Sequence, residues 1–119
     1  MDNFSVEFYT KSDGTKPAKE FLIELEPKMR AKLLGIIEIL EEKGNALREP
    51  YSKYISDGIF EIRGKVGSNI SRVMYFFYYE HRIVLTNGFI KKSQNTPKKE
   101  IELAKRYRKD FLERNGHNE

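Results

Sequence analysis

Two arginines, Arg63 and Arg72, stand in neighbouring β-rich runs, and the turn between the runs decides how they face each other. The turn at 67–68 is Gly-Ser, which suits a two-residue hairpin loop. In that register Val66 faces Asn69, and Arg63 faces Arg72 on one face of the sheet. Like charges placed directly opposite each other destabilise a sheet, so the pair is best tolerated where an anion sits between the guanidinium groups. Two guanidinium groups can hold a phosphate and stabilise the extra negative charge that develops as it reacts.

Two further cations, Lys91 and Lys92, close the next β-rich run. The segment from Ile59 to Lys99 holds eight lysines and arginines against two glutamates. A basic sheet of this kind favours a polyanionic partner, with RNA or DNA as the first candidate. Because neighbouring strand residues point to opposite faces, one of the two lysines should join the arginine pair. These cations could also serve only to keep the surface soluble, because arginines in strands and lysines on surfaces are more often solvated charges than parts of a site.

The sequence offers little support for other chemistries. It contains no cysteine, its two histidines fall in an expected turn (His81) and in the tail (His117), and few carboxylates accompany the basic strands. We therefore expect no metal site, no cofactor and no catalytic histidine pair. RNA can be cut without these groups, because its own 2′-hydroxyl serves as the nucleophile. A lysine or tyrosine acting as the general base would need a depressed pKa, which a cluster of cations supplies.

The elements that must position these residues read as one α+β domain over residues 1–119, in the order β-α-α-β-β-β-α. The first two helices should form an antiparallel hairpin on one face of a small antiparallel sheet, and residues 45–58 should form a loop. Thr96 and Pro97 suit the start of the last helix, with Thr96 as its N-cap. We expect strands at Phe4–Tyr9, Ile59–Val66, Ile70–Tyr79 (central) and Arg82–Ile90, and helices from Pro17 to the residues before Pro27, from Lys28 to Lys43 and from Pro97 to Arg114.

The sequence has no apolar run long enough to span a membrane and no signal peptide at its start, so we expect a cytoplasmic protein without a membrane partner.

Three motifs in the second half of the chain resemble a known family. The first runs from Asp57 to Arg63 (DGIFEIR), the second from Arg72 to Phe76 (RVMYF), and the third from Asn87 to Ala104 (NGFIKKSQNTPKKEIELA). Together they resemble the RelE/HigB-type toxins of type II toxin–antitoxin systems, in the branch known as phage-derived proteins. Asn87 stands where many members of that branch have a histidine.

This resemblance implies a RelE-like fold and an mRNA-cleaving endoribonuclease that acts on translating ribosomes and is silenced by a cognate antitoxin, commonly a helix-turn-helix protein. It assigns Arg63 and Arg72 to the scissile phosphate, and Lys91 or Lys92 to positive charge or proton transfer. It also suggests base-stacking or orienting roles for the aromatic residues Tyr54, Tyr75 and Phe89. A ParE-like inhibitor of DNA gyrase, without nuclease activity, is the alternative, because the same fold serves both functions.

Overall fold

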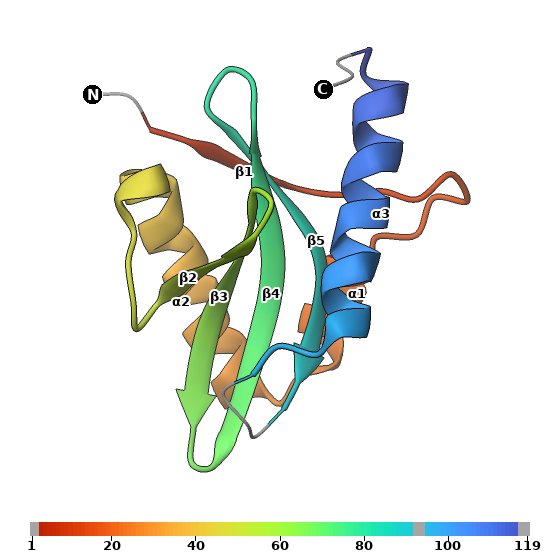
Figure 1. The fold of residues 1–119 in the computed structure, drawn as a ribbon. Helices are drawn as coiled ribbons and strands as arrows, with labels where there is room; N and C mark the ends of the chain where they lie inside the picture. Colours follow the sequence, from red (N-terminus) through yellow and green to blue (C-terminus); the bar gives the residue numbers. More distant parts are fainter. Residues whose placement is uncertain (1–2, 92–94, 117–119) are drawn as a thin grey trace.

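The computed structural model describes residues 3–91 and 95–116, and within them the chain forms five strands and three α-helices (Figure 1). Each expected strand and helix is present, so the predicted α+β class is confirmed. None of the described helices is both long enough and apolar enough to cross a membrane. In chain order the elements are β1 (Ser5–Phe8), α1 (Pro17–Glu24), α2 (Pro27–Lys43), β2 (Ser52–Ser56), β3 (Ile59–Val66), β4 (Asn69–Tyr78), β5 (Arg82–Ile90) and α3 (Lys98–Arg114).

The strands form one sheet in the order β1-β5-β4-β3-β2. Neighbouring strands are antiparallel except β1 and β5, which run parallel. β4 is the middle strand, as its apolar residues on both faces predict, because a central strand is covered on both sides. The first strand, β1, lies at one edge of the sheet.

The segment expected to be a loop, residues 45–58, contains the strand β2, so that expectation is wrong. β2 pairs with the first half of β3 at the other edge of the sheet, and a short 3-10 helix covers Gly44–Ala46. Among the five residues of β2 only Ser52 is buried, so the apolar alternation by which strands are recognised is missing. Pairing with β3, rather than the preference of its own residues, makes this segment a strand.

The helices α1 and α2 cover one face of the sheet (Figure 1). α2 approaches β3 closely at Gly64, where an added Cβ would lie 3.0 Å from Leu33 Cδ2 and 3.2 Å from Lys32 Cγ. The missing side chain therefore lets the helix pack on the strand backbone and brings Lys32 beside β3. The core on this face includes Leu22, Leu33, Leu40, Ile62, Val73 and Leu85.

The helix α3 covers the opposite face, where the alternate sheet residues point. Ala104 and Phe111 of the helix pack there against sheet side chains that include Met74 and Phe76. Tyr9, which follows β1, donates a hydrogen bond of 2.6 Å to Asp110 Oδ2, and Arg114 binds the same carboxylate at 2.7 Å. These contacts tie the C-terminal half of α3 to the first strand.

Two glycines, one just after α2 and one inside it, should change the stability of the fold in opposite directions when replaced by alanine. Gly44 follows the helix with a φ of 52°, and an added Cβ would overlap the ring of Phe4. Gly44→Ala should therefore lower the free energy of unfolding by about 2–4 kcal/mol. Gly35 lies inside α2 with nothing within 4 Å of an added Cβ, so Gly35→Ala should raise it by about 0.5–1 kcal/mol. Urea denaturation measures both, and equal effects would contradict the packing of Phe4 on Gly44.

The contact between Tyr9 and α3 should make stability depend on pH. The hydrogen bonds from Tyr9 and then Arg114 hold the pKa of Asp110 below its usual 3.8. A depressed carboxyl pKa stabilises the fold at neutral pH, and this contribution is lost as the pH falls below about 4. Tyr9→Phe should therefore lower the free energy of unfolding by about 1 kcal/mol at pH 7, with a smaller loss near pH 3. Urea titrations at the two pH values test this, and a loss independent of pH would contradict it.

Candidate functional site

The register of β3 and β4 places Arg63 directly opposite Arg72. The hairpin has the two-residue turn expected from the sequence, with Val66 opposite Asn69, so this prediction is confirmed. Arg72 lies on the same strand face as Met74, which packs beneath α3. The arginine pair therefore belongs to the α3 face of the sheet.

The carboxylate of Glu61 lies between the two guanidinium groups. Its Oε2 accepts a hydrogen bond from Arg63 Nε and lies 4.0 Å from Arg72 Nε. The side chains of Glu61 and Arg72 have no exposed surface, whereas Arg63 keeps 14% of its side chain exposed. The anion that the facing arginines require is thus supplied by the chain itself, and the three groups together carry one net positive charge.

The segment leading into α3 covers this cluster. The backbone carbonyl of Asn95 accepts a hydrogen bond of 3.1 Å from Arg72 Nη1, and Thr96 Oγ1 donates one of 2.9 Å to Glu61 Oε1. Thr96 was expected to cap the last helix, and that expectation is wrong: α3 begins at Lys98 without a side-chain cap, because the Thr96 hydroxyl is bound to Glu61. Arg63 is therefore the guanidinium of the pair that solvent can reach.

Burial governs the electrostatics of the inner arginine. Burial lowers the pKa of Arg72 from its usual value, the Glu61 carboxylate raises it, and the charge of Arg63 lowers it again. Arginine remains charged in spite of such shifts, because its unperturbed pKa is so high. Arg72 therefore adds a fixed positive charge behind the accessible Arg63.

Phe89 and Lys91 are the other predicted site residues on this face. Phe89 pairs with Arg72 across the sheet, and the Arg72 guanidinium carbon lies 5.7 Å from the centre of its ring. The Lys91 N–H donates a hydrogen bond of 3.0 Å to the carbonyl of Ile70, so strand-like pairing continues past β5. By alternation the exposed Lys91 shares the face of Phe89. Lys92 lies outside the described residues.

The two predicted tyrosines lie on the other face of the sheet. Tyr75 is 1% exposed within the core beneath α1 and α2, its hydroxyl lies 2.5 Å from Ser52 Oγ, and burial raises its pKa. Tyr54 is exposed on β2, where its ring contacts Phe60 at a centroid distance of 5.2 Å. Phe60 in turn stacks on Tyr75. The structure therefore does not bring Tyr54 or Tyr75 together with the arginines.

Asn87 fixes the start of α3. It lies in an irregular stretch where the pairing of β4 with β5 skips from Val73 to Tyr75. Its Nδ2 donates to Glu100 Oε1 at 3.1 Å, and its Oδ1 accepts from Thr86 Oγ1 at 2.7 Å. Asn87 is buried, and its described contacts hold the first turn of α3 beside the arginine cluster.

Sequence reasoning missed the roles of Glu61 and Thr96. A signal for Glu61 was present, because Glu61 and Arg63 are two residues apart on one strand and point to the same face. Thr96 gave no comparable signal, because its contact joins residues 35 positions apart in the chain. Within residues 3–91 and 95–116, no group of three His, Asp or Glu side chains is placed to hold a metal ion.

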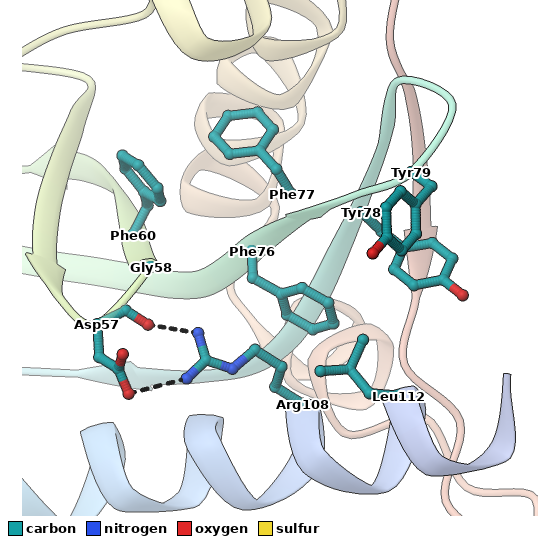
Figure 2. Close-up of a pocket in the computed structure, with 9 residues that line it drawn as sticks. All are labelled: Asp57, Gly58, Phe60, Phe76, Phe77, Tyr78, Tyr79, Arg108 and Leu112. Atoms are coloured by element: carbon teal, nitrogen blue, oxygen red, sulfur yellow. Dashed lines mark hydrogen bonds and ion pairs between the residues drawn. The ribbon is translucent and has the colours of Figure 1, made fainter. Parts of the chain in front are cut away.

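A separate cavity lies at the other end of β3. Its volume is about 600 Å³. Figure 2 shows the residues that line it, mainly aromatic side chains, between the β2–β3 turn, the end of β4 and the C-terminal half of α3. Arg108 donates a hydrogen bond to the carbonyl of Asp57 and lies 3.2 Å from its carboxylate, which closes one wall. Neither Arg63 nor Arg72 lines this cavity, so we do not count it as part of the candidate site.

Comparison with known protein families shows to which family the chain belongs. Residues 20–109 match a family model described as "Phage derived protein Gp49-like (DUF891)". This chain belongs to the Gp49-like family. The Gp49-like region includes all of the described site residues, from Glu61 to Thr96.

Among solved structures, this Gp49-like protein is similar to a chain of the archaeal RelE–RelB complex from Pyrococcus horikoshii OT3, with 16% sequence identity and a TM-score of 0.49. The match covers 79% of this chain and 99% of the archaeal chain. No curated protein matches the Gp49-like chain.

The buried carboxylate should be essential to stability. Glu61→Gln keeps the size of the side chain but removes its charge, so the free energy of unfolding should fall by about 3–5 kcal/mol. Adding Arg72→Met should restore much of the loss, because the buried cation is then removed as well. Denaturant unfolding of both variants tests this coupling. If Glu61→Gln is harmless, or if Arg72→Met adds a further full loss, the ion cluster does not control stability.

Proposed function

We propose that this Gp49-like protein is the toxin of a toxin–antitoxin system and that it cleaves mRNA without a metal ion. Membership of the Gp49-like family supports the assignment as a toxin. The pairing of Arg63 with Arg72 around Glu61 supports the nuclease chemistry. That cluster is the observation on which the proposal depends, because it keeps one net positive charge after Glu61 is counted and leaves the Arg63 guanidinium within reach of solvent, where a phosphate could bind.

The proposed reaction uses the RNA as its own nucleophile. The 2′-oxygen attacks the neighbouring phosphorus, its proton passes to a base, and the 5′-oxygen of the next nucleotide leaves with a proton. The products are a 2′,3′-cyclic phosphate and a free 5′-hydroxyl. The phosphorane formed on the way carries an additional negative charge, and a fixed guanidinium group stabilises that charge most where water is largely excluded.

In the proposed mechanism the two arginines have different roles. Arg63 can reach a phosphate, and the Glu61 carboxylate holds its guanidinium group in one orientation. Arg72 raises the positive potential from behind without touching solvent. Lys91, exposed on the same face, supplies further positive charge or moves a proton, and Lys92 is a candidate for the same task.

The proposed ribosome dependence has a physical reason. A site built from arginine and lysine lacks a strong general base at neutral pH, so much of the acceleration must come from holding the 2′-oxygen in line with the leaving oxygen. A ribosome that grips the mRNA on both sides supplies this alignment. The proposed partners are therefore the translating ribosome with its mRNA, and a cognate antitoxin of helix-turn-helix type.

Replacing Arg63 should abolish cleavage while leaving the fold intact. Induction of the wild-type chain in a sensitive bacterium should create new mRNA 5′ ends inside translated regions within minutes. Arg63→Gln should reduce the number of these 5′ ends by about 100-fold or more, because it removes the positive charge that would contact the phosphate. The matched control is Arg106→Gln, which removes an exposed arginine from α3 and should cleave normally.

Other outcomes of this experiment would contradict the proposal. Full cleavage by Arg63→Gln would place the chemistry elsewhere. Growth arrest by the wild-type chain with intact mRNA would favour inhibition of a protein target such as DNA gyrase, and an intact supercoiling activity in the same cells would exclude gyrase in turn. Far-ultraviolet circular dichroism of each purified variant shows whether a loss of activity reflects a loss of fold.

A further inference from the structure

A basic hollow lies at the open edge of β3, on the side where Arg63 reaches solvent. Its volume is about 280 Å³, and its lining includes Arg63, Lys65 and Lys32 together with the aromatic ring of Tyr51. A second and shallower hollow of about 540 Å³ shares Lys32 and Lys65 with the first and adds Lys28. The two hollows therefore form one continuous surface, which we call the basic track: Tyr51, Arg63, Lys65, Lys32 and Lys28.

The fold brings these cations together from two different elements. The absence of a side chain at Gly64 lets α2 approach β3, which sets Lys32 beside the strand residues on either side of the glycine. Lys28 stands one helical turn before Lys32, about 6 Å away along the axis of α2. The track therefore runs from the edge of the sheet onto the surface of the helix.

The strand edge along the track is open. The last pair between β2 and β3 is Ser52 with Ile62, and beyond it the Arg63 N–H donates a hydrogen bond of 2.9 Å to the carbonyl of Tyr51. By strand alternation the N–H of Lys65 points to the same side, past the end of β2. A backbone donor and an ammonium group thus face the same hollow.

The charges of the three lysines along the track are poorly compensated. Among the described residues, no carboxylate lies within 4.0 Å of the ammonium groups of Lys28, Lys32 or Lys65. Glu49 is the one acidic residue in the lining of the two hollows. Clustered like charges repel one another, and a polyanion relieves that repulsion by replacing their counterions.

Tyr51 adds a feature that a purely electrostatic surface would lack. Tyr51 is 42% exposed beside the cations, and its backbone carbonyl accepts the hydrogen bond from the Arg63 N–H. An exposed aromatic ring next to lysines is the arrangement on which an unpaired base stacks while its phosphates are neutralised.

We propose that the basic track binds the single-stranded RNA that flanks the scissile phosphate, with phosphates on Lys65, Lys32 and Lys28 and a base stacked on Tyr51. This inference rests on the proposed function, because Arg63 belongs to both the cleavage site and the track. The proposal gives the path of the RNA over the protein surface: from Arg63 the strand runs around the edge of β3 toward α2, rather than across the face covered by α3.

Binding of an uncleavable RNA tests the track separately from catalysis. The probe is a fluorescently labelled, 2′-O-methylated single strand of about 12 nucleotides, which covers a typical single-strand site but lacks the nucleophile. Fluorescence anisotropy between about 50 and 300 mM salt gives the affinity and its salt dependence. The variants are Lys32→Ala/Lys65→Ala and Tyr51→Ala. The control is Lys16→Ala/Lys19→Ala, which removes two exposed lysines at the start of α1, a helix that packs over β5 rather than over β3.

The lysine variant should bind the probe at least about 10-fold more weakly, and the slope of log affinity against log salt should fall by about 1.4, or 0.7 for each lost contact. Tyr51→Ala should weaken binding by about 5-fold or more with an unchanged slope, because stacking releases no counterions. The control pair should bind like the wild type.

An equal loss in the control pair would overturn the track, because binding would then follow net charge alone. Absence of wild-type binding, or unchanged binding by the Lys32→Ala/Lys65→Ala variant, would overturn it too. The cleavage assay separates this failure from failure of the proposed function. If the wild type cleaves mRNA in cells while the track variants bind and cleave normally, the RNA-binding role of the track is refuted and the proposed nuclease activity is retained. If the wild type does not cleave, the proposed function is wrong whatever the probe shows.

Discussion

The buried carboxylate of Glu61 is the interaction on which the charged face of this sheet depends. Burying a cation in a protein is costly unless a counter-charge and hydrogen bonds accompany it. Here one carboxylate faces Arg72, orients Arg63 and accepts a hydrogen bond from Thr96. β3, β4 and the segment that leads into α3 therefore meet at a single side chain, and the position of α3 is linked to the geometry of the arginines.

The two faces of the sheet have different tasks. The face beneath α1 and α2 is an apolar core, into which even the polar ring of Tyr75 is packed with its hydroxyl bound to Ser52. The face beneath α3 combines a smaller apolar cluster with the charged group around Glu61. Separation by face keeps the desolvated charges away from the main core, so that chemistry can vary on one side without disturbing packing on the other.

The sequence predicts those parts of the site that depend on local rules. A two-residue turn and strand alternation sufficed to place Arg63 opposite Arg72. The same alternation puts Tyr75 on the opposite face, which disagrees with the orienting role that the family resemblance suggested for it. The contacts of Thr96 and Asn95 join the segment before α3 to distant strands, and no periodicity encodes such contacts. β2 was not predicted for a related reason. Its residues form a strand because they pair with the edge of β3, so the signal for this strand lies in its partner and not in its own sequence.

The segment that covers the arginine cluster also determines the order in which its contacts can form while the protein is being synthesised. Glu61 and Arg72 are made well before Asn95 and Thr96, the residues that complete their contacts, and α3 follows later still. Strands β3 and β4 can pair as a local hairpin as soon as they leave the ribosome, whereas the contacts that enclose their charges wait for the segment before α3. A nascent chain therefore cannot hold the finished arrangement of Glu61 and Arg72 until Asn95 and Thr96 have been made, so the mature site forms later than the hairpin that carries its arginines.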